Sequence, residues 1–225
     1  PVSGKQDEGL RLEAQRLLES SDVIDLHIDT LIPTRLYGYN PIKSHGAGIW
    51  RGRLFGHLDV PRIQAGGLTG AMWSITTQPF RSEGSRWRRF LKNLKRLDEL
   101  IQASKGALAL ATNVKEYQSA RERGAHAVFP AVQGGNSLAG APNGVASIPG
   151  NMVTRVTLVH LTDSCFGTTS SPLRFGQDRG LGPRGLELIE QVEVESVSSV
   201  GLGLVRIGMN FCKQAVDTDS HRCPS

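Results

Sequence analysis

Short apolar segments alternate with amphipathic segments along this chain, and that alternation limits the folds open to it. Short apolar runs bounded by turn residues are typical of buried strands; they cover residues 23–30, 68–75, 127–132 and 153–160. Segments with helical spacing or helix-ending glycines surround them, at residues 8–20, 59–67, 84–104, 114–124 and 184–191. Strands that alternate with helices predict an α/β domain with a parallel sheet.

Polar side chains stand at the ends of most predicted strands. His27 and Asp29 close the first strand, Gln133 follows the third and His160 ends the fourth. Polar groups at the carboxyl ends of parallel strands are typical of (β/α)8 barrels, so a fold of the TIM-barrel type is expected. An open doubly wound sheet is the rival, because it also binds ligands at strand ends. No G-x-G-x-x-G motif follows the first strand, so nucleotide binding has little support.

The end of the first strand is a candidate metal site. Alternate side chains of a strand share one face, so His27 and Asp29 are expected to project side by side. An imidazole and a carboxylate placed in this way can ligate a metal ion. The alternative interpretation is a histidine and an aspartate that only bond to the nearby backbone.

Composition argues against several kinds of partner. The net charge is +5, but the densest basic run lies within residues 84–104. There it interleaves with apolar residues at helical spacing, which is typical of the solvated face of a helix. Nucleic-acid binding is therefore not expected. No apolar run reaches 18 residues, so no transmembrane segment is expected.

Three cysteines, Cys165, Cys212 and Cys223, show no regular spacing, which argues against a disulfide framework and a zinc knuckle. The sequence carries no visible signal-peptide core. A soluble chain is expected, and its compartment stays open.

Several polar residues are expected to be structural. Asp59 precedes Pro61 at the start of a predicted helix and is expected to cap it. Trp73 is expected in the core. His45 and His57 lie in a long segment, residues 31–57, that is predicted to be irregular and to close over the site, and both are expected to be solvated.

Several segments together resemble the renal (membrane) dipeptidase family of zinc metallopeptidases, a branch of the amidohydrolase-like barrels. The matching stretches are Asp25-Leu26-His27-Ile28-Asp29-Thr30, Leu58-Asp59-Val60-Pro61-Arg62 with Ala65-Gly66-Gly67, Trp73-Ser74, Val132-Gln133-Gly134-Gly135-Asn136-Ser137 and Thr157-Leu158-Val159-His160. Arg179-Gly180-Leu181 with Gly185 and Leu188 resembles the loop and helix that follow. The resemblance extends over residues 12–191.

The resemblance implies a barrel with two zinc ions at its mouth that hydrolyses dipeptides. It assigns His27 and Asp29 to metal binding and His160 to substrate contact. It places Gln133 where the family has a glutamate that bridges both ions. The family reaction is attack of a metal-bridging hydroxide on the peptide carbonyl, made possible because a bound metal lowers the pKa of water to about 7.

Gln133 departs from that pattern in charge as well as shape. A bridging carboxylate offsets the repulsion between two cations, whereas a glutamine is neutral and offers one carbonyl oxygen. Weaker binding of at least one metal, or a one-metal site, is therefore expected. The alternative is a loop amide that bonds to the backbone.

Length limits how much of a barrel the chain can form. A (β/α)8 barrel takes about 250 residues, and four strands are already used by residue 160. We therefore expect residues 1–191 to form the N-terminal part of a barrel and residues 192–225 to be a divergent tail, as in a truncated or frame-altered product. His221, in that tail, does not match the family pattern. The open edges of a half-barrel also predict oligomerisation.

Two hypotheses follow. The first is a zinc-dependent dipeptidase-like hydrolase, impaired in this chain, that acts on dipeptides through a metal-activated water. The second is a non-catalytic relative or truncated fragment without a competent metal centre.

Overall fold

The computed structural model describes residues 4–46, 56–78, 80–171 and 180–198. The longer helices are α1 (Gly4–Ser20), α4 (Glu83–Ala103), α5 (Val114–Glu122) and α6 (Pro183–Ser198), and the short ones are α2 (Leu31–Tyr37) and α3 (Val60–Ala65). The strands are β1 (Ile24–Ile28), β2 (Gly70–Thr76), β3 (Leu108–Leu110), β4 (His126–Gln133) and β5 (Arg155–Thr157). Three 3-10 turns, η2 (Gly135–Ser137), η3 (Gly144–Ser147) and η4 (Pro149–Asn151), connect β4 to β5. Residues 199–225, with Cys212, His221 and Cys223, lie outside the described residues.

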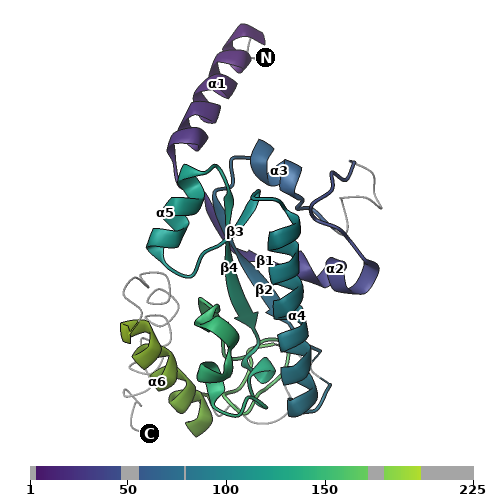
Figure 1. Ribbon diagram of the computed structural model, residues 1–225, viewed down its shortest axis with the longest axis vertical. Coiled ribbons are helices and arrows are strands. Elements are labelled where there is room, and N and C mark those ends of the chain that lie inside the picture. Colours follow the sequence, from purple (N-terminus) through teal and green to yellow (C-terminus); the bar gives the residue numbers. More distant parts are fainter. Residues whose placement is uncertain (1–3, 47–55, 79, 172–179, 199–225) are drawn as a thin grey trace, which may run out of the picture.

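The strands form one parallel sheet in which successive major strands are neighbours (Figure 1). β1 pairs with β2, and β2 pairs with β4 along its whole length. The other edge of β4 is shared, because β3 pairs with its first residues and β5 with its last three, Ala131 to Gln133. The order β1-β2-β4-β5 runs in one direction without the reversal of a doubly wound sheet. The chain therefore has the predicted α/β fold, a parallel half-barrel.

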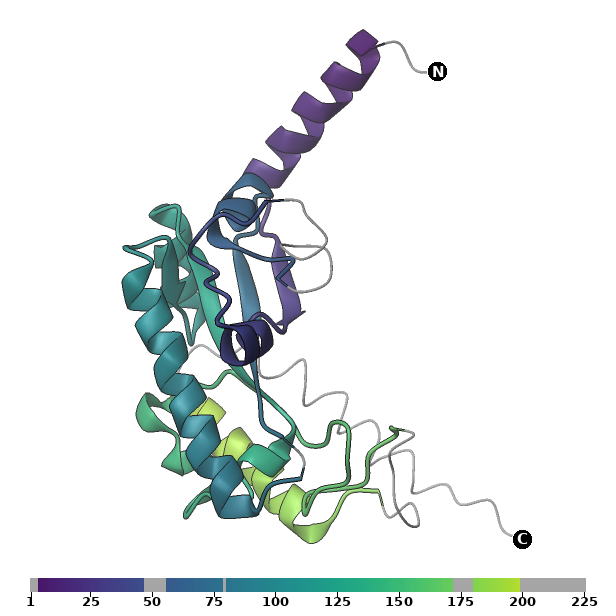
Figure 2. The same ribbon diagram turned by 90° about the vertical axis from the view of Figure 1, so that its right-hand side faces the viewer.

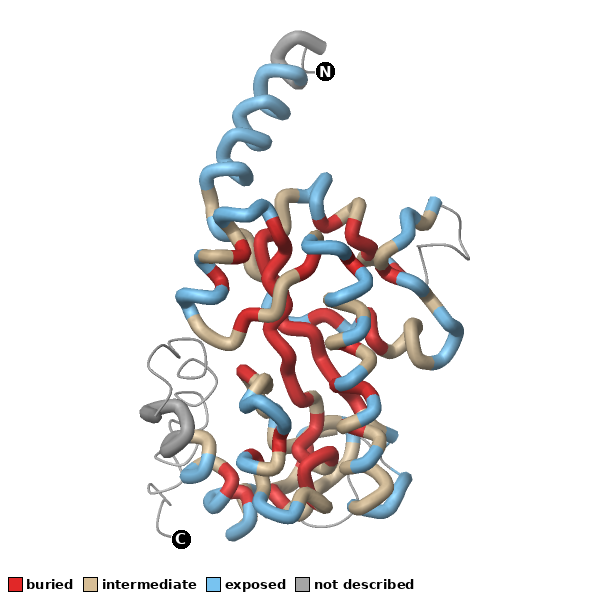
Figure 3. Tube along the Cα trace, in the orientation of Figure 1, coloured by how far each residue is buried: buried red, intermediate tan, exposed pale blue. Residues whose placement is uncertain are grey.

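Both faces of the central strands are buried (Figure 3). Trp73 and Ile75 of β2 belong to the same buried cluster as Phe90 and Leu94 of α4. The opposite face carries a second cluster that includes Phe129 of β4, whose ring lies against Tyr117 of α5. Strands buried on both faces have near-continuous apolar sequences, which is why β2 and β4 could be recognised before the fold was known. The prediction that Trp73 is a core residue is confirmed.

Three parts of the sequence prediction need correction. The segment after β1 is not wholly irregular, because it contains α2, which ends at Gly38 in the left-handed conformation. β3 was missed because a strand of three residues gives no periodic signal. The fourth predicted strand, residues 153–160, is strand only in β5, and the carbonyl of Leu158 bonds outside the sheet, to the backbone of Gly135.

The N-terminal helix extends away from the amino-terminal end of the sheet (Figures 1 and 2). Its side chains from Glu8 to Ser20 are exposed. The connection after it is held by Asp22, whose Oδ1 accepts hydrogen bonds from Tyr117 and Arg121, both at 2.7 Å. At the other end of the chain, α6 continues past Gln191 to Ser198. In the described part of the chain, no helix is long and apolar enough to cross a membrane.

Candidate functional site

His27 and Asp29 lie together at the carboxyl end of β1, as predicted. Nε2 of His27 is 3.2 Å from Oδ2 of Asp29, and both side chains are about two-fifths exposed (40% and 43%). The register between β1 and β2 shifts between Asp25 and Ile28, which is a local bulge. Bulges re-aim side chains next to active sites. Here His27 points across the sheet towards β2, where Oγ of Ser74 is 3.1 Å from its Nδ1.

Gln133 and His160 complete the group of four predicted site residues. Gln133 is the last residue of β4, and its side-chain Nε2 lies 3.1 Å from Nε2 of His27 and 3.1 Å from Nε2 of His160. The amide nitrogen thus stands between the two imidazole rings. Its carbonyl oxygen, Oε1, is buried and has no hydrogen-bond partner. The prediction that these residues converge is correct, and Gln133 does not bond to the backbone as the alternative required.

Two further residues of the site, Ser74 and Arg155, were not identified from the sequence. Nη2 of Arg155 lies 3.0 Å from Nδ1 of His27 and 3.3 Å from Oγ of Ser74, and Nη1 donates to the carbonyl of Leu26. A guanidinium can only donate, so Nδ1 of His27 must accept. The remaining proton of neutral His27 then sits on Nε2 and points to Asp29. An N–H at Nε2 cannot accept from the Gln133 amide 3.1 Å away, so that amide meets the ring through its oxygen, with its nitrogen and oxygen exchanged. Two clues were available for Arg155: it begins a strand, and it lies five residues before His160.

Burial lowers the pKa of two side chains of the site, His160 and Arg155. Burial lowers the pKa of His160, the nearby Asp29 carboxylate opposes this effect, and His27 lowers the pKa further. His160 is therefore neutral at neutral pH, so one of its ring nitrogens can donate a hydrogen bond and the other can accept one. Burial also lowers the pKa of Arg155, and Asp29 opposes it. That guanidinium remains a cation at neutral pH and adds positive charge beside His27.

The donors present do not fit a two-zinc centre. Zinc sites need several imidazole, thiolate or carboxylate ligands around one point. The described residues contain no cluster of three or more His, Cys, Asp or Glu side chains placed to hold a metal. The point between His27 and His160 is filled by the amide of Gln133, which carries no charge and offers at most one carbonyl oxygen to a cation. Among the described residues, His27 and Asp29, together with the Gln133 carbonyl, are the groups that could hold a single ion.

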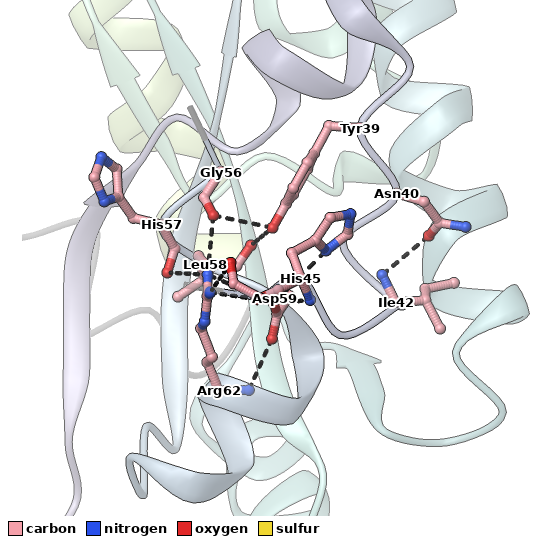
Figure 4. Close-up of polar contacts among 10 residues, drawn as sticks. Tyr39, Asn40, Ile42, His45, Gly56, His57, Leu58, Asp59 and Arg62 are labelled. Carbon is pink, nitrogen blue, oxygen red and sulfur yellow. Dashed lines mark hydrogen bonds and ion pairs between the residues drawn. The ribbon is translucent and has the colours of Figure 1, made fainter. Parts of the chain in front are cut away.

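Asp59 is a structural residue, as predicted, and it holds the backbone at His45 against the start of α3 (Figure 4). It is fully buried and caps α3 by accepting from the backbone N–H of Arg62 at 2.9 Å. It also accepts from the backbone N–H of His45 at 3.0 Å. His57 is exposed, as expected. The prediction that His45 is solvated is wrong, because its ring is mostly buried (22% exposed) and stacks on Tyr39 with 4.1 Å between centroids.

The parallel half-barrel, with a histidine–aspartate pair at the carboxyl end of its first strand, defines the class of the protein by its fold: a partial barrel of the TIM-barrel type. The particular family follows from the sequence, because the model of the membrane dipeptidase family (peptidase family M19) matches residues 11–197. The chain belongs to this family of zinc-dependent metallo-dipeptidases.

Solved structures agree with the fold. The probable dipeptidase PvdM from Pseudomonas aeruginosa is 16% identical with a TM-score of 0.66, over 82% of this chain and 47% of its own. The dipeptidase AC, a metallopeptidase of family M19, is 21% identical with a TM-score of 0.62, over 76% of this chain and 53% of its own. A metallopeptidase from Rhodobacter sphaeroides, liganded with a phosphinate mimic of the dipeptide L-Ala-D-Ala, is 17% identical with a TM-score of 0.60, over 76% and 55%. This chain thus spans about half the length of the structures it matches.

Proposed function

We propose that this chain is a dipeptidase-like hydrolase whose metal centre is weakened, so that it holds at most one divalent cation and hydrolyses dipeptides poorly. Membership of the M19 family supports the reaction class. One observation carries the weakening: a neutral amide, that of Gln133, lies 3.1 Å from the imidazole nitrogens of both His27 and His160.

Charge explains why a glutamine at this point matters. Two dications a few ångströms apart repel strongly, and the repulsion grows in the low effective dielectric of a partly buried site. A carboxylate at residue 133 would supply one negative charge and two oxygens. The amide supplies no charge, and the cation of Arg155 beside His27 adds repulsion. A second metal ion therefore has little to offset its charge here.

The side chains of this half of the site have definable tasks. A divalent cation, when bound, would supply the acidity that makes water a usable nucleophile. His27 and Asp29 are the residues that would hold it. Asp29 also orients the His27 ring through the 3.2 Å contact with Nε2. His160, neutral and half-buried, is the proposed donor of a hydrogen bond to a substrate oxygen.

Replacement of Gln133 by glutamate tests this proposal. We expect the wild-type chain to bind fewer than two zinc ions and to turn over dipeptides slowly. In Gln133→Glu we expect at least about tenfold tighter zinc binding, which corresponds to about 1.4 kcal/mol. Gln78→Glu is the matched control, because it adds the same charge to the wall of the same cavity without touching either imidazole. Zinc content by elemental analysis and zinc affinity by calorimetry are the measurements. Two tightly held zinc ions in the wild type, or equal gains in both variants, would contradict the proposal.

The second candidate is a non-catalytic relative or fragment. It is favoured by the hydrogen bond that Arg155 makes to His27, since this occupies a metal-ligand residue. Zinc binding regained in Gln133→Glu without any dipeptide hydrolysis would support this alternative over the hydrolase.

A further inference from the structure

A half-buried arginine stands beside the candidate site without an acidic partner. Arg35 belongs to α2, and its Nη1 donates to the carbonyl of Thr76, the last residue of β2, at 2.8 Å. That bond uses one of the five N–H donors of the guanidinium. Among the described residues, no carboxylate forms an ion pair with Arg35. Its positive charge is therefore not neutralised by any carboxylate of the described residues.

The surroundings of Arg35 are themselves cationic. Burial is the largest cause of the lowered pKa of Arg35, and Arg89, Arg96 and Arg81 lower it further. Each of these neighbours repels the guanidinium, and no acidic side chain in the described part of the chain acts against them. Nη1 of Arg96 is also buried without a hydrogen-bond partner. Partly desolvated charges of one sign are costly unless an opposite charge pairs with them. An anion is the group that would satisfy this cluster.

A small cavity connects Arg35 to the imidazole of His160. It has a volume of about 190 Å³ and lies at the carboxyl ends of β2 and β4. Its polar wall includes Arg35, Gln133, Asn136 and His160, and Ile32 and Leu161 supply apolar surface. Sites for whole drug-sized ligands take about 300–1,000 Å³. This cavity is smaller, so it suits one charged end of a small molecule together with a small side chain.

We propose that this cavity binds the carboxylate of a peptide-like ligand through Arg35, with the rest of the ligand directed towards His160. Arginine pairs with carboxylates through two parallel hydrogen bonds. The hydrogen bond from Nη1 of Arg35 to the Thr76 carbonyl holds the guanidinium in position for such a pair. The identification of the ligand as a peptide rests on the proposed function. The presence of an anion subsite rests only on Arg35 and its neighbours.

The proposal is tested by ligand binding and not by turnover, because binding can be measured even if the chain has no hydrolytic activity. The ligands are the dipeptide D-Ala-D-Ala, the same dipeptide with an amidated C-terminus, and inorganic phosphate, all titrated without added metal and followed by NMR. Arg35→Gln removes the charge. Arg88→Gln on the exposed face of α4 is the matched control, because it removes an equal charge away from the cavity.

We expect the free dipeptide to bind the wild type and Arg88→Gln alike and to bind Arg35→Gln at least about tenfold more weakly, which is the usual scale for losing a hydrogen bond to a charged group. Amidation of the ligand should cause a similar loss in the wild type. Equal binding of the amidated dipeptide, unchanged binding in Arg35→Gln, or binding of phosphate alone would overturn the proposal. Arg35→Lys, which keeps the charge, should bind better than Arg35→Gln if both variants melt like the wild type. The zinc measurements on Gln133→Glu are independent of these outcomes, so the two proposals can fail separately.

Discussion

The guanidinium of Arg155 lies 3.0 Å from Nδ1 of His27, and this contact joins the first and last strands of the half-barrel. It fixes the hydrogen-bonding role of the ring. Nδ1 accepts from Arg155, so Nε2 carries the proton that faces Asp29 at 3.2 Å. A metal ion at Nε2 would require that proton to move to Nδ1, where it would meet the Arg155 donor. Arg155 therefore favours the form of His27 that does not bind metal through Nε2.

Removal of Arg155 should make His27 a better ligand. In Arg155→Met, Nδ1 would face only the hydroxyl of Ser74, which can accept or donate a hydrogen bond. We expect zinc affinity to rise at least about tenfold, or about 1.4 kcal/mol, measured by calorimetry. The nitrogen-15 shifts of the His27 ring should show the proton on Nε2 in the wild type. Arg88→Met is the control for lost charge. A proton on Nδ1 in the wild type, or unchanged zinc affinity, would contradict this reasoning.

His126 should make stability depend on pH. Its ring is buried, Nε2 accepts from the indole N–H of Trp73 at 3.2 Å, and Nδ1 lies 2.9 Å from the carbonyl of Leu68. Burial lowers the pKa of His126, against a smaller opposing effect of the Leu68 carbonyl. The unfolded chain therefore binds the proton more readily. Stability should be constant above about pH 6.5 and fall as the pH drops below that value.

The slope of that loss can approach about 1.4 kcal/mol per pH unit for one residue. Urea unfolding between pH 5 and 8 measures it. His126→Gln keeps an acceptor for Trp73 but does not titrate, so the slope below pH 6.5 should become shallower than in the wild type. Identical slopes in the two proteins would show that His126 is not responsible.

The Asp59 network should contribute more to stability than a helix cap alone. Asp59 is fully buried, caps α3, and lies 3.6 Å from both the Arg62 guanidinium and the His45 ring. Loss of an ordinary cap costs about 1 kcal/mol, and Asp59 also accepts from the backbone N–H of His45, whose loss as a buried hydrogen bond adds about 1–3 kcal/mol. We expect Asp59→Ala to lose about 3 kcal/mol of unfolding free energy or more. Asn113→Ala, which removes the cap of α5, is the matched comparison. Similar losses of unfolding free energy in both variants would show that Asp59 acts only as a helix cap.

The exposed leucines of α1 should promote self-association. Leu10 and Leu17 are 60% and 66% exposed on a helix that extends away from the sheet. Exposed apolar side chains on one element favour association. We expect sedimentation to show association that rises with concentration and is reduced in Leu10→Gln/Leu17→Gln. Leu36→Gln on α2, also about half exposed (52%), is the control. A monomer at all concentrations would contradict this expectation.

Local pattern was enough to locate β2, β4 and α4, because strands buried on two faces and a helix buried on one face have different apolar periods. The convergence of His27, Asp29, Gln133 and His160 was also predictable, since parallel strands bring their carboxyl ends to one edge. α2 and β3 could not be located, because seven and three residues are too few to show a period. Arg35 looks like an ordinary cation in the sequence, and Arg155 is set apart only by its place at the start of a strand, five residues before His160.

The sequence by itself determined the α/β class, the edge of the sheet that carries the site, and the neutral amide where a bridging carboxylate was expected. The tertiary structure alone decided how those groups act. It placed the Gln133 amide between two imidazoles, Arg155 beside His27, and Arg35 among like charges. The physical reason is that the apolar pattern along the chain decides whether a side chain faces the core or the solvent. Hydrogen-bond roles and charge balance instead depend on distances between residues as far apart in sequence as His27 and Arg155, and only folding sets those distances.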